Sequence, residues 1–173
     1  MTYWVITDTH FGHEKMHEHC DRPIGFEDRI LSNVDRIVRE GDVLIHLGDI
    51  CIGKDQYWNL ALHAICKGSQ WLIRGNHDKK SISWYLNNGW DCVADSITLN
   101  IFGESIVFSH KPVPLVGEVV NIHGHHHNTN HHPEDVIDKR HRLLCLEHHY
   151  SPVNLSKIIS QHQISFSKCG HTR

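Results

Sequence analysis

The stretch "QWLIRGNHD", residues 70 to 78, places an apolar run directly before a glycine and a group of polar side chains. Such a short apolar run is typical of a buried strand. The same order occurs twice upstream, because residues 3–7 run into Asp-Thr-His at 8–10 and residues 43–47 run into Gly-Asp at 48–49. We therefore expect three successive strands, each with polar side chains at its carboxyl end.

Helical patterns separate these strands. Residues 27–39 carry apolar side chains at helical spacing, residues 55–65 do so again, and Ser81 can cap a short helix that Gly89 closes. Strands that alternate with helices form mainly parallel sheets, in which ligands collect at the carboxyl ends of the strands. The first half of the chain thus predicts an α/β sheet with a functional edge.

The second half is richer in strands. Alternation at 97–101 and again at 106–108 predicts a hairpin, further strands are expected at 119–122 and 143–147, and Asn154 can cap a last helix through about residue 161. Two of these strands also run into histidines, at Ser-His 109–110 and Gly-His-His-His 124–127. Five strand ends are therefore expected to converge on one edge and form a site.

Composition narrows the class of protein. The chain has 173 residues, 39% of them hydrophobic, which suits one domain over residues 1–173 with an irregular tail from about residue 163. No apolar run approaches the roughly 20 residues that cross a bilayer, and the N-terminus does not resemble a signal peptide. We expect a cytoplasmic protein with no membrane contact. Its six cysteines, which form no C-x-x-C pair, are expected to be reduced.

Charge argues against an extended nucleic-acid surface, since the formal net charge is −3 with neutral histidines. Histidine is the outlier, at 19 residues. Neutral imidazole is the commonest metal ligand in proteins, which makes this excess a pointer to metal binding. The sequence does not indicate an oligomeric state.

Each strand-end cluster alone could be a polar turn. Together, the clusters supply a set of side chains that could bind two divalent metal ions. The candidate ligands are carboxylates, an amide and imidazoles: Asp8, His10, Asp49, Asn76, His110, His125 and His127. This mixture favours borderline ions, manganese first, with iron, zinc or nickel as alternatives. Two metals about 3.5–4 Å apart can lower the pKa of a bridging water and brace an in-line displacement at phosphorus. His77, which the ligand count leaves over, could protonate the leaving group.

These blocks, in this order, resemble the calcineurin-like metallophosphoesterase superfamily. The matches are D-x-H at 8–10, G-D at 48–49, G-N-H-D at 75–78, His110, and G-H-x-H at 124–127. The opening "DTHFGH" and the later "DRP" are further similar to a small, cap-less subgroup of phosphoesterases found in bacteria and phages. The resemblance implies an α/β fold, a four-layer αββα sandwich of two mixed β-sheets flanked by helices.

The resemblance also implies roles for the matched residues. Asp8, His10 and His127 would hold one metal, Asp49 would bridge, and the second metal would take the remaining ligands, which are Asn76, His110 and His125. His77 would be the general acid that completes attack by a metal-bridging hydroxide, with Asp78 orienting it.

Substrate contacts are harder to assign. Arginine suits phosphate through its bidentate fork, which makes Arg22 and Arg74 candidates, and His13 is a further one because it closely follows the first cluster. Arg74 also fits a simple charge at the end of a sheet. His131 and His132, in a polar loop, are expected to be plain surface.

The favoured function is hydrolysis of a small phosphate ester, most simply a nucleotide-type phosphodiester. Nucleotide phosphomonoesterase activity is the alternative, because both reactions use the same ligands. Nuclease activity ranks lower, since the charge balance offers no track for a polyanion. A non-catalytic metal-binding scaffold and a histidine-rich metal store are the other classes. The complete set of motif residues argues against the scaffold, and the metal content per chain would distinguish the store, which should bind many ions weakly.

Overall fold

The computed structural model describes residues 1–128, 135 and 137–160 of the chain. Its first sheet has the strand order β4 (Cys92–Ala94), β3 (Ser69–Ile73), β2 (Val43–His46), β1 (Tyr3–Ile6) and β9 (Val153–Asn154). β1 to β4 are parallel and β9 joins antiparallel at the edge, so the sheet is mixed. The parallel strands bring their carboxyl ends to the same side, as the strand–helix alternation predicted.

The second sheet has the order β5 (Ser96–Ile101), β6 (Glu104–Ser109), β7 (Val119–His123) and β8 (His141–Leu143). β5 and β6 form the predicted antiparallel hairpin, whose turn at Phe102-Gly103 takes positive φ at both residues, 54° and 79°. Such paired positive φ values match the twist of the flanking strands. β6, β7 and β8 run parallel, so this sheet is mixed too.

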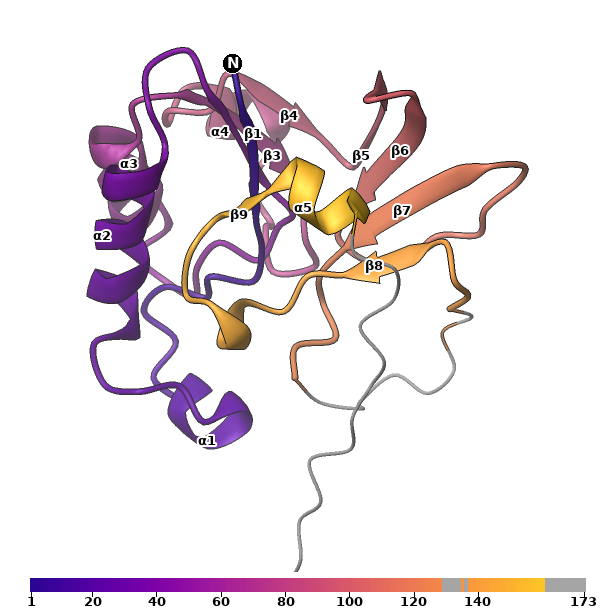
Figure 1. Cartoon of the computed structure of the whole chain (residues 1–173). Helices are drawn as coiled ribbons and strands as arrows, with labels where there is room; N and C mark the ends of the chain where they lie inside the picture. Colours follow the sequence, from indigo (N-terminus) through magenta and orange to yellow (C-terminus); the bar gives the residue numbers. More distant parts are fainter. Residues whose placement is uncertain (129–134, 136, 161–173) are drawn as a thin grey trace, which may run out of the picture.

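Helices α2 (Phe26–Ile37) and α3 (Asp55–Ile65) lie side by side against one face of the first sheet (Figure 1). α4 (Ile82–Leu86) begins after Ser81, whose hydroxyl accepts a hydrogen bond from the Trp84 amide at 3.2 Å, as expected of a cap. The remaining helical segments are short. They are α1 (Met16–Cys20), the 3₁₀ turn η1 (Leu146–His148) and α5 (Leu155–Ser160).

Two hydrophobic clusters define the layers. One fills the space between the helices and the first sheet, where Ile30 and Val34 of α2 are fully buried. The other lies between the two sheets and packs Val5 and Ile45 with Phe108. Helices, first sheet and second sheet thus form successive layers. The outward side chains of the edge strand β5 are exposed.

Two sequence-based expectations need correction. The strand expected at residues 143–147 begins and ends earlier: β8 spans His141–Leu143, the Leu144 amide donates to the His123 carbonyl, and the chain then turns into η1. The five polar strand ends also belong to two sheets rather than one. The expected features at His131, His132, Cys169 and the tail from about residue 163 lie outside the described residues. No helix within the described ranges has the length and hydropathy that a bilayer crossing requires.

Candidate metal centre

The site lies where the carboxyl ends of the two sheets meet. β1, β2 and β3 of the first sheet lead into Asp8, Asp49 and Asn76, while β6 and β7 of the second sheet lead into His110 and the segment 124–127. Backbone hydrogen bonds hold the strand ends together within each sheet: the amide of Asp8 donates to the Gly48 carbonyl at 2.9 Å, and the amide of Gly124 donates to the His110 carbonyl at 3.0 Å. The predicted ligands are therefore brought together by both sheets.

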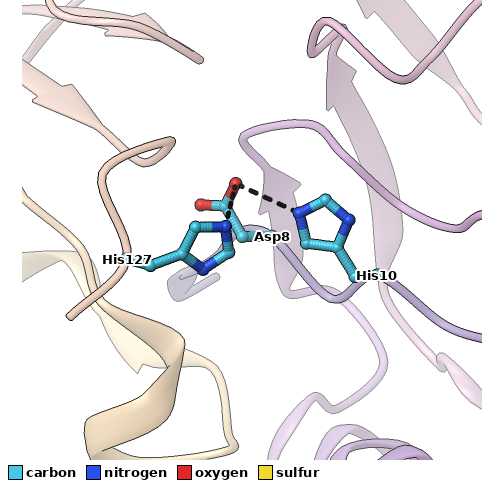
Figure 2. Close-up of side chains that lie close together, drawn as sticks. All are labelled: Asp8, His10 and His127. Carbon is cyan, nitrogen blue, oxygen red and sulfur yellow. Dashed lines mark ion pairs between the residues drawn. The ribbon is translucent and has the colours of Figure 1, made fainter. Parts of the chain in front are cut away.

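A first group of possible ligands consists of Asp8, His10 and His127, whose side chains converge in Figure 2. Asp8 Oδ1 lies 4.0 Å from His10 Nε2 and 3.9 Å from His127 Nε2. Two atoms that each bind one ion at about 2.1 Å lie at most about 4.2 Å apart, so these separations suit a shared cation. Within the described residues, Asp8 Oδ1 is buried and has no hydrogen-bond partner. An unpaired buried carboxylate oxygen is what a metal would satisfy.

A second group consists of Asp49, His110 and His125. His110 Nε2 lies 3.3 Å from Asp49 Oδ2, 3.1 Å from His125 Nδ1 and 3.0 Å from Asn76 Oδ1. The other His110 nitrogen, Nδ1, lies 2.8 Å from the Leu47 carbonyl, to which only a protonated nitrogen can donate. A neutral His110 therefore turns an unprotonated Nε2 toward the group, which is the form that ligates a metal.

Asp49 connects the two groups. Its Oδ2 lies 3.7 Å from His10 Nε2 in the first group and 3.3 Å from His110 Nε2 in the second. Burial raises the pKa of Asp49, but hydrogen bonding and charge from His110, with further help from His10, outweigh burial and hold it well below the ordinary value. A permanently ionised carboxylate between two ligand groups has the position and charge that a bridging ligand needs.

Burial shifts the pKa values of Asp8 and His10, two members of the first group of possible ligands. Burial raises the pKa of Asp8 above its ordinary value, and the neighbouring His110 and His127 offset this effect only in part. Burial lowers the pKa of His10 to about 2, so this imidazole is neutral near pH 7. A neutral imidazole beside two buried carboxylates matches the donor set of a borderline divalent ion. The described residues therefore fit the metals that the sequence predicts.

The backbone at the site is strained. Five residues of the two groups adopt left-handed φ values between 46° and 70°: Asp8, His10, Asp49, His125 and His127. Residues other than glycine rarely adopt this region, and such outliers cluster at functional sites, where the surrounding structure compensates for the strain. The turn after each strand thus directs its ligand into the site.

His77 lies at the rim. Its side chain is 45% exposed, its Nε2 lies 3.9 Å from Asp49 Oδ2, and its amide donates to Asp49 Oδ1 at 2.8 Å. Asp78 is buried and does something else: its carboxylate accepts from the amides of Asp49, Gly75 and Ile50 at 2.7–3.2 Å. No hydrogen bond joins Asp78 to the His77 ring within the described part of the chain. Asp78 therefore holds together the loops that carry Asp49 and His77.

The three expected substrate contacts lie in different environments. The Arg22 side chain is fully buried and donates to Glu147 and to two backbone carbonyls, so it does not face solvent. Arg74 bonds Asp95 at 2.6 Å and sits at the end of the sheet. His13 is partly buried, with its ring centroid 5.7 Å from that of His10. His13 thus combines partial exposure with a ring that lies beside a candidate metal ligand, His10.

Glu147 is a residue of the site that was not expected from the sequence. Its Oε1 lies 3.0 Å from His127 Nδ1 and 2.6 Å from Arg22 Nη2, and it forms a further group of possible ligands with Cys20 and His127. The sequence carries no signal for this contact, since Glu147 stands in a run that resembles a strand. Cys20 and Cys145, like the other described cysteines, are free thiols.

Comparison with known proteins identifies the family of the chain. The family model described as calcineurin-like phosphoesterase matches residues 1–172. No curated protein matches the chain. The chain is similar to the structure of the protein of unknown function AQ665 from Aquifex aeolicus, with 24% identity, coverage of 91% of this chain and 97% of that chain, and a TM-score of 0.71. It is also similar to the nuclease MPE from Pseudomonas putida, with 24% identity, coverage of 72% and 61%, and a TM-score of 0.48.

The protein belongs to the calcineurin-like phosphoesterase family, as the motif order indicated. The family implies divalent metal ions, and the described residues include side-chain groups able to bind them. The two mixed sheets with helices agree with the fold that the resemblance implied.

Proposed function

We propose that the protein hydrolyses small phosphate diesters, with nucleotide-type substrates favoured, at a centre of two divalent metals. The observation that carries this proposal is the position of Asp49 between two ligand groups, 3.7 Å from His10 and 3.3 Å from His110. A shared carboxylate supports two adjacent ions rather than two separate sites. Manganese is the favoured metal, because carboxylate, amide and imidazole ligands occur together.

The bound ions would supply an activated water and a clamp for the phosphoryl oxygens. Asp8, His10 and His127 would hold one ion, and Asn76, His110 and His125 the other, with Asp49 shared between them. His77, half-exposed beside Asp49, would donate the proton on Nε2 to the oxygen that leaves. His13, whose ring lies beside that of His10, would contact the substrate.

The charges around the site favour a diester over a monoester. A diester carries one negative charge at phosphorus and a monoester up to two, so the monoester needs more cationic partners. The two arginines near the strand ends already form ion pairs within the protein, Arg22 with Glu147 and Arg74 with Asp95. Histidines at the rim are weaker sources of positive charge than arginine, which is always protonated.

The test compares bis(p-nitrophenyl) phosphate with p-nitrophenyl phosphate in the presence of manganese, for wild type and Asp49→Asn. The proposal expects turnover by wild type, faster with the diester, and loss of turnover together with metal in the variant. Faster cleavage of the monoester would replace the diester assignment with a phosphomonoesterase. A wild type that binds two ions and cleaves neither ester nor any nucleotide diester would overturn the proposed activity.

A further inference from the structure

Glu147 joins a metal-ligand candidate to a buried cation. Its Oε1 accepts from His127 Nδ1 at 3.0 Å and from Arg22 Nε and Nη2 at 3.0 and 2.6 Å. The Glu147 side chain is 4% exposed and that of Arg22 is fully buried. Because Nδ1 of His127 is occupied by Glu147, the opposite nitrogen, Nε2, is the one directed at Asp8 Oδ1, 3.9 Å away.

Arg22 reaches the first ligand group from the other side as well. Its Nη2 donates to the Asp8 carbonyl and its Nη1 to the Thr9 carbonyl, both at 2.7 Å. One guanidinium thus holds the backbone between Asp8 and His10, and through Glu147 it also holds the ring of His127. All three members of the first group, which come from two different sheets, are connected by this one ion pair.

The second ligand group is supported differently. His110 Nδ1 lies 2.8 Å from a neutral backbone carbonyl, that of Leu47, rather than from a carboxylate. A carboxylate behind a ligating histidine raises the basicity of the ligand and fixes its orientation more strongly than a carbonyl does. The two groups therefore differ in the residues that support them, and removal of the Glu147 carboxylate affects only one.

A competing interpretation treats Glu147 as a ligand itself, since Cys20, His127 and Glu147 could also surround an ion. The Arg22 guanidinium argues against it, because this buried cation is already 2.6 Å from Oε1 and a second cation there would be repelled. The Glu147 carboxylate is thus neutralised by arginine.

We propose that Glu147, held by Arg22, is the positioning residue of His127 and gives the first ligand group its affinity for metal. The inference rests on the proposed two-metal function. Removal of the carboxylate interaction should weaken one of two metal sites by about 10- to 100-fold and leave the other unchanged.

The test is a titration of the metal-free protein with Mn²⁺, followed by the EPR signal of free Mn²⁺. Glu147→Gln keeps the side-chain length but removes the charge, and Glu147→Asp keeps the charge beside Arg22 but shortens the reach to His127. Asp42→Asn is the matched control: it removes a carboxylate that binds Thr2 and Trp4 before the start of β2, at the far end of the sheet. Thermal unfolding of the metal-free proteins shows which variants fold.

The expected result is two tight Mn²⁺ sites in wild type and in the control, and one tight and one weakened site in both Glu147 variants. Two unchanged sites in a folded Glu147 variant would overturn the inference while leaving the two-metal proposal intact. The inference would equally fall if Cys20→Ser weakened the same site as much as the Glu147 variants did, because the thiol would then be a ligand. Failure of wild type to bind two ions would overturn the two-metal proposal itself, and this inference with it.

A measurement on wild type covers the case in which neither Glu147 variant folds. Nitrogen-15 NMR of the histidine rings in the Zn²⁺-loaded protein reports which nitrogen carries the proton. The inference expects the proton of His127 on Nδ1, facing Glu147. A proton on Nε2, or Nδ1 bound to metal, would overturn it.

Discussion

Gly124 packs directly against the carboxylate of Asp8: a β-carbon on Gly124 would lie 2.3 Å from Asp8 Oδ2 and 2.0 Å from the Thr7 hydroxyl. The neighbouring amide of His125 donates to the same Oδ2 at 2.9 Å. Gly75 has the same relationship to the other carboxylate, since a β-carbon there would lie 2.2 Å from Asp49 Oδ1. Gly75 and Gly124 thus each leave room for one aspartate of the candidate metal centre.

Gly124→Ala is therefore expected to displace Asp8 and to weaken metal binding by at least about tenfold, the scale of disturbed metal surroundings. Mn²⁺ titration of the metal-free protein measures this. Gly103→Ala is the matched control, because a β-carbon at Gly103 meets nothing within 4 Å. Its φ of 79° makes alanine cost about 1–2 kcal/mol of stability, with no loss of metal. Equal metal affinity in both variants would contradict the packing argument.

His77→Ala is expected to lower turnover by about 10²- to 10⁴-fold, the range of general acid catalysis, while two metals stay bound. The side chain is 45% exposed and belongs to neither ligand group, so its removal leaves the ligands in place. The loss should be larger for an alkyl ester than for a p-nitrophenyl ester, because nitrophenolate leaves without a proton. His63→Ala, which removes an exposed histidine from α3, is the control. A variant that loses metal would exclude His77 as a pure proton donor.

The sequence predicted those parts of the site that depend on local order. Asp8, Asp49 and His110 each directly follow an apolar strand, and parallel strands bring such residues to the same end of a sheet. The prediction assigned all the strand ends to one edge, whereas β6 and β7 belong to a second sheet. Strand pairing is a non-local property, which the pattern of a single strand does not contain.

The roles of Arg22 and Glu147 could not be predicted for the same reason. They are 125 residues apart, and their ion pair forms only because the short segment after α1 and the turn η1 pack behind the ligands. From the sequence, Arg22 suggested a phosphate contact, since arginine binds phosphate well. In the structure, the Arg22 guanidinium instead donates its hydrogen bonds to the buried carboxylate of Glu147 and to two backbone carbonyls.

Asp78→Asn is expected to destabilise the metal-free protein by about 1–3 kcal/mol, the cost of leaving buried hydrogen-bonding groups unsatisfied. The carboxylate accepts from three backbone amides, and an asparagine NH₂ cannot accept where it replaces an oxygen. Urea unfolding measures the change. Asp91→Asn is the control, because Asp91 also accepts from a backbone amide, that of Gln70, but is exposed. An equally small effect in both variants would contradict the fixing role of Asp78.

The folded protein is expected to lose stability in acid, in part because of His46, at the end of β2. Its Nε2 lies 3.0 Å from the hydroxyl of Thr9, which already donates to the Ile50 carbonyl at 2.7 Å and so can only accept from His46. Its Nδ1 accepts from the Gly48 amide at 3.0 Å. Both ring nitrogens are thus satisfied in the neutral form, and a second proton would face an N–H donor.

Burial lowers the pKa of His46 from 6.5 to about 3 in the folded protein. The unfolded chain therefore binds the extra proton first, so the stability linked to His46 is fully present above pH 6.5 and is lost as the pH falls toward 3. The slope is at most about 1.4 kcal/mol per pH unit in this window. Urea unfolding in EDTA, repeated from about pH 7 to about pH 5, compares wild type with His46→Gln, which cannot take up this proton. His46→Gln should be less stable than wild type near neutral pH, and its free energy of unfolding should fall less steeply as the pH is lowered. If the free energy of unfolding falls in parallel in the two proteins, His46 is not a source of the acid sensitivity.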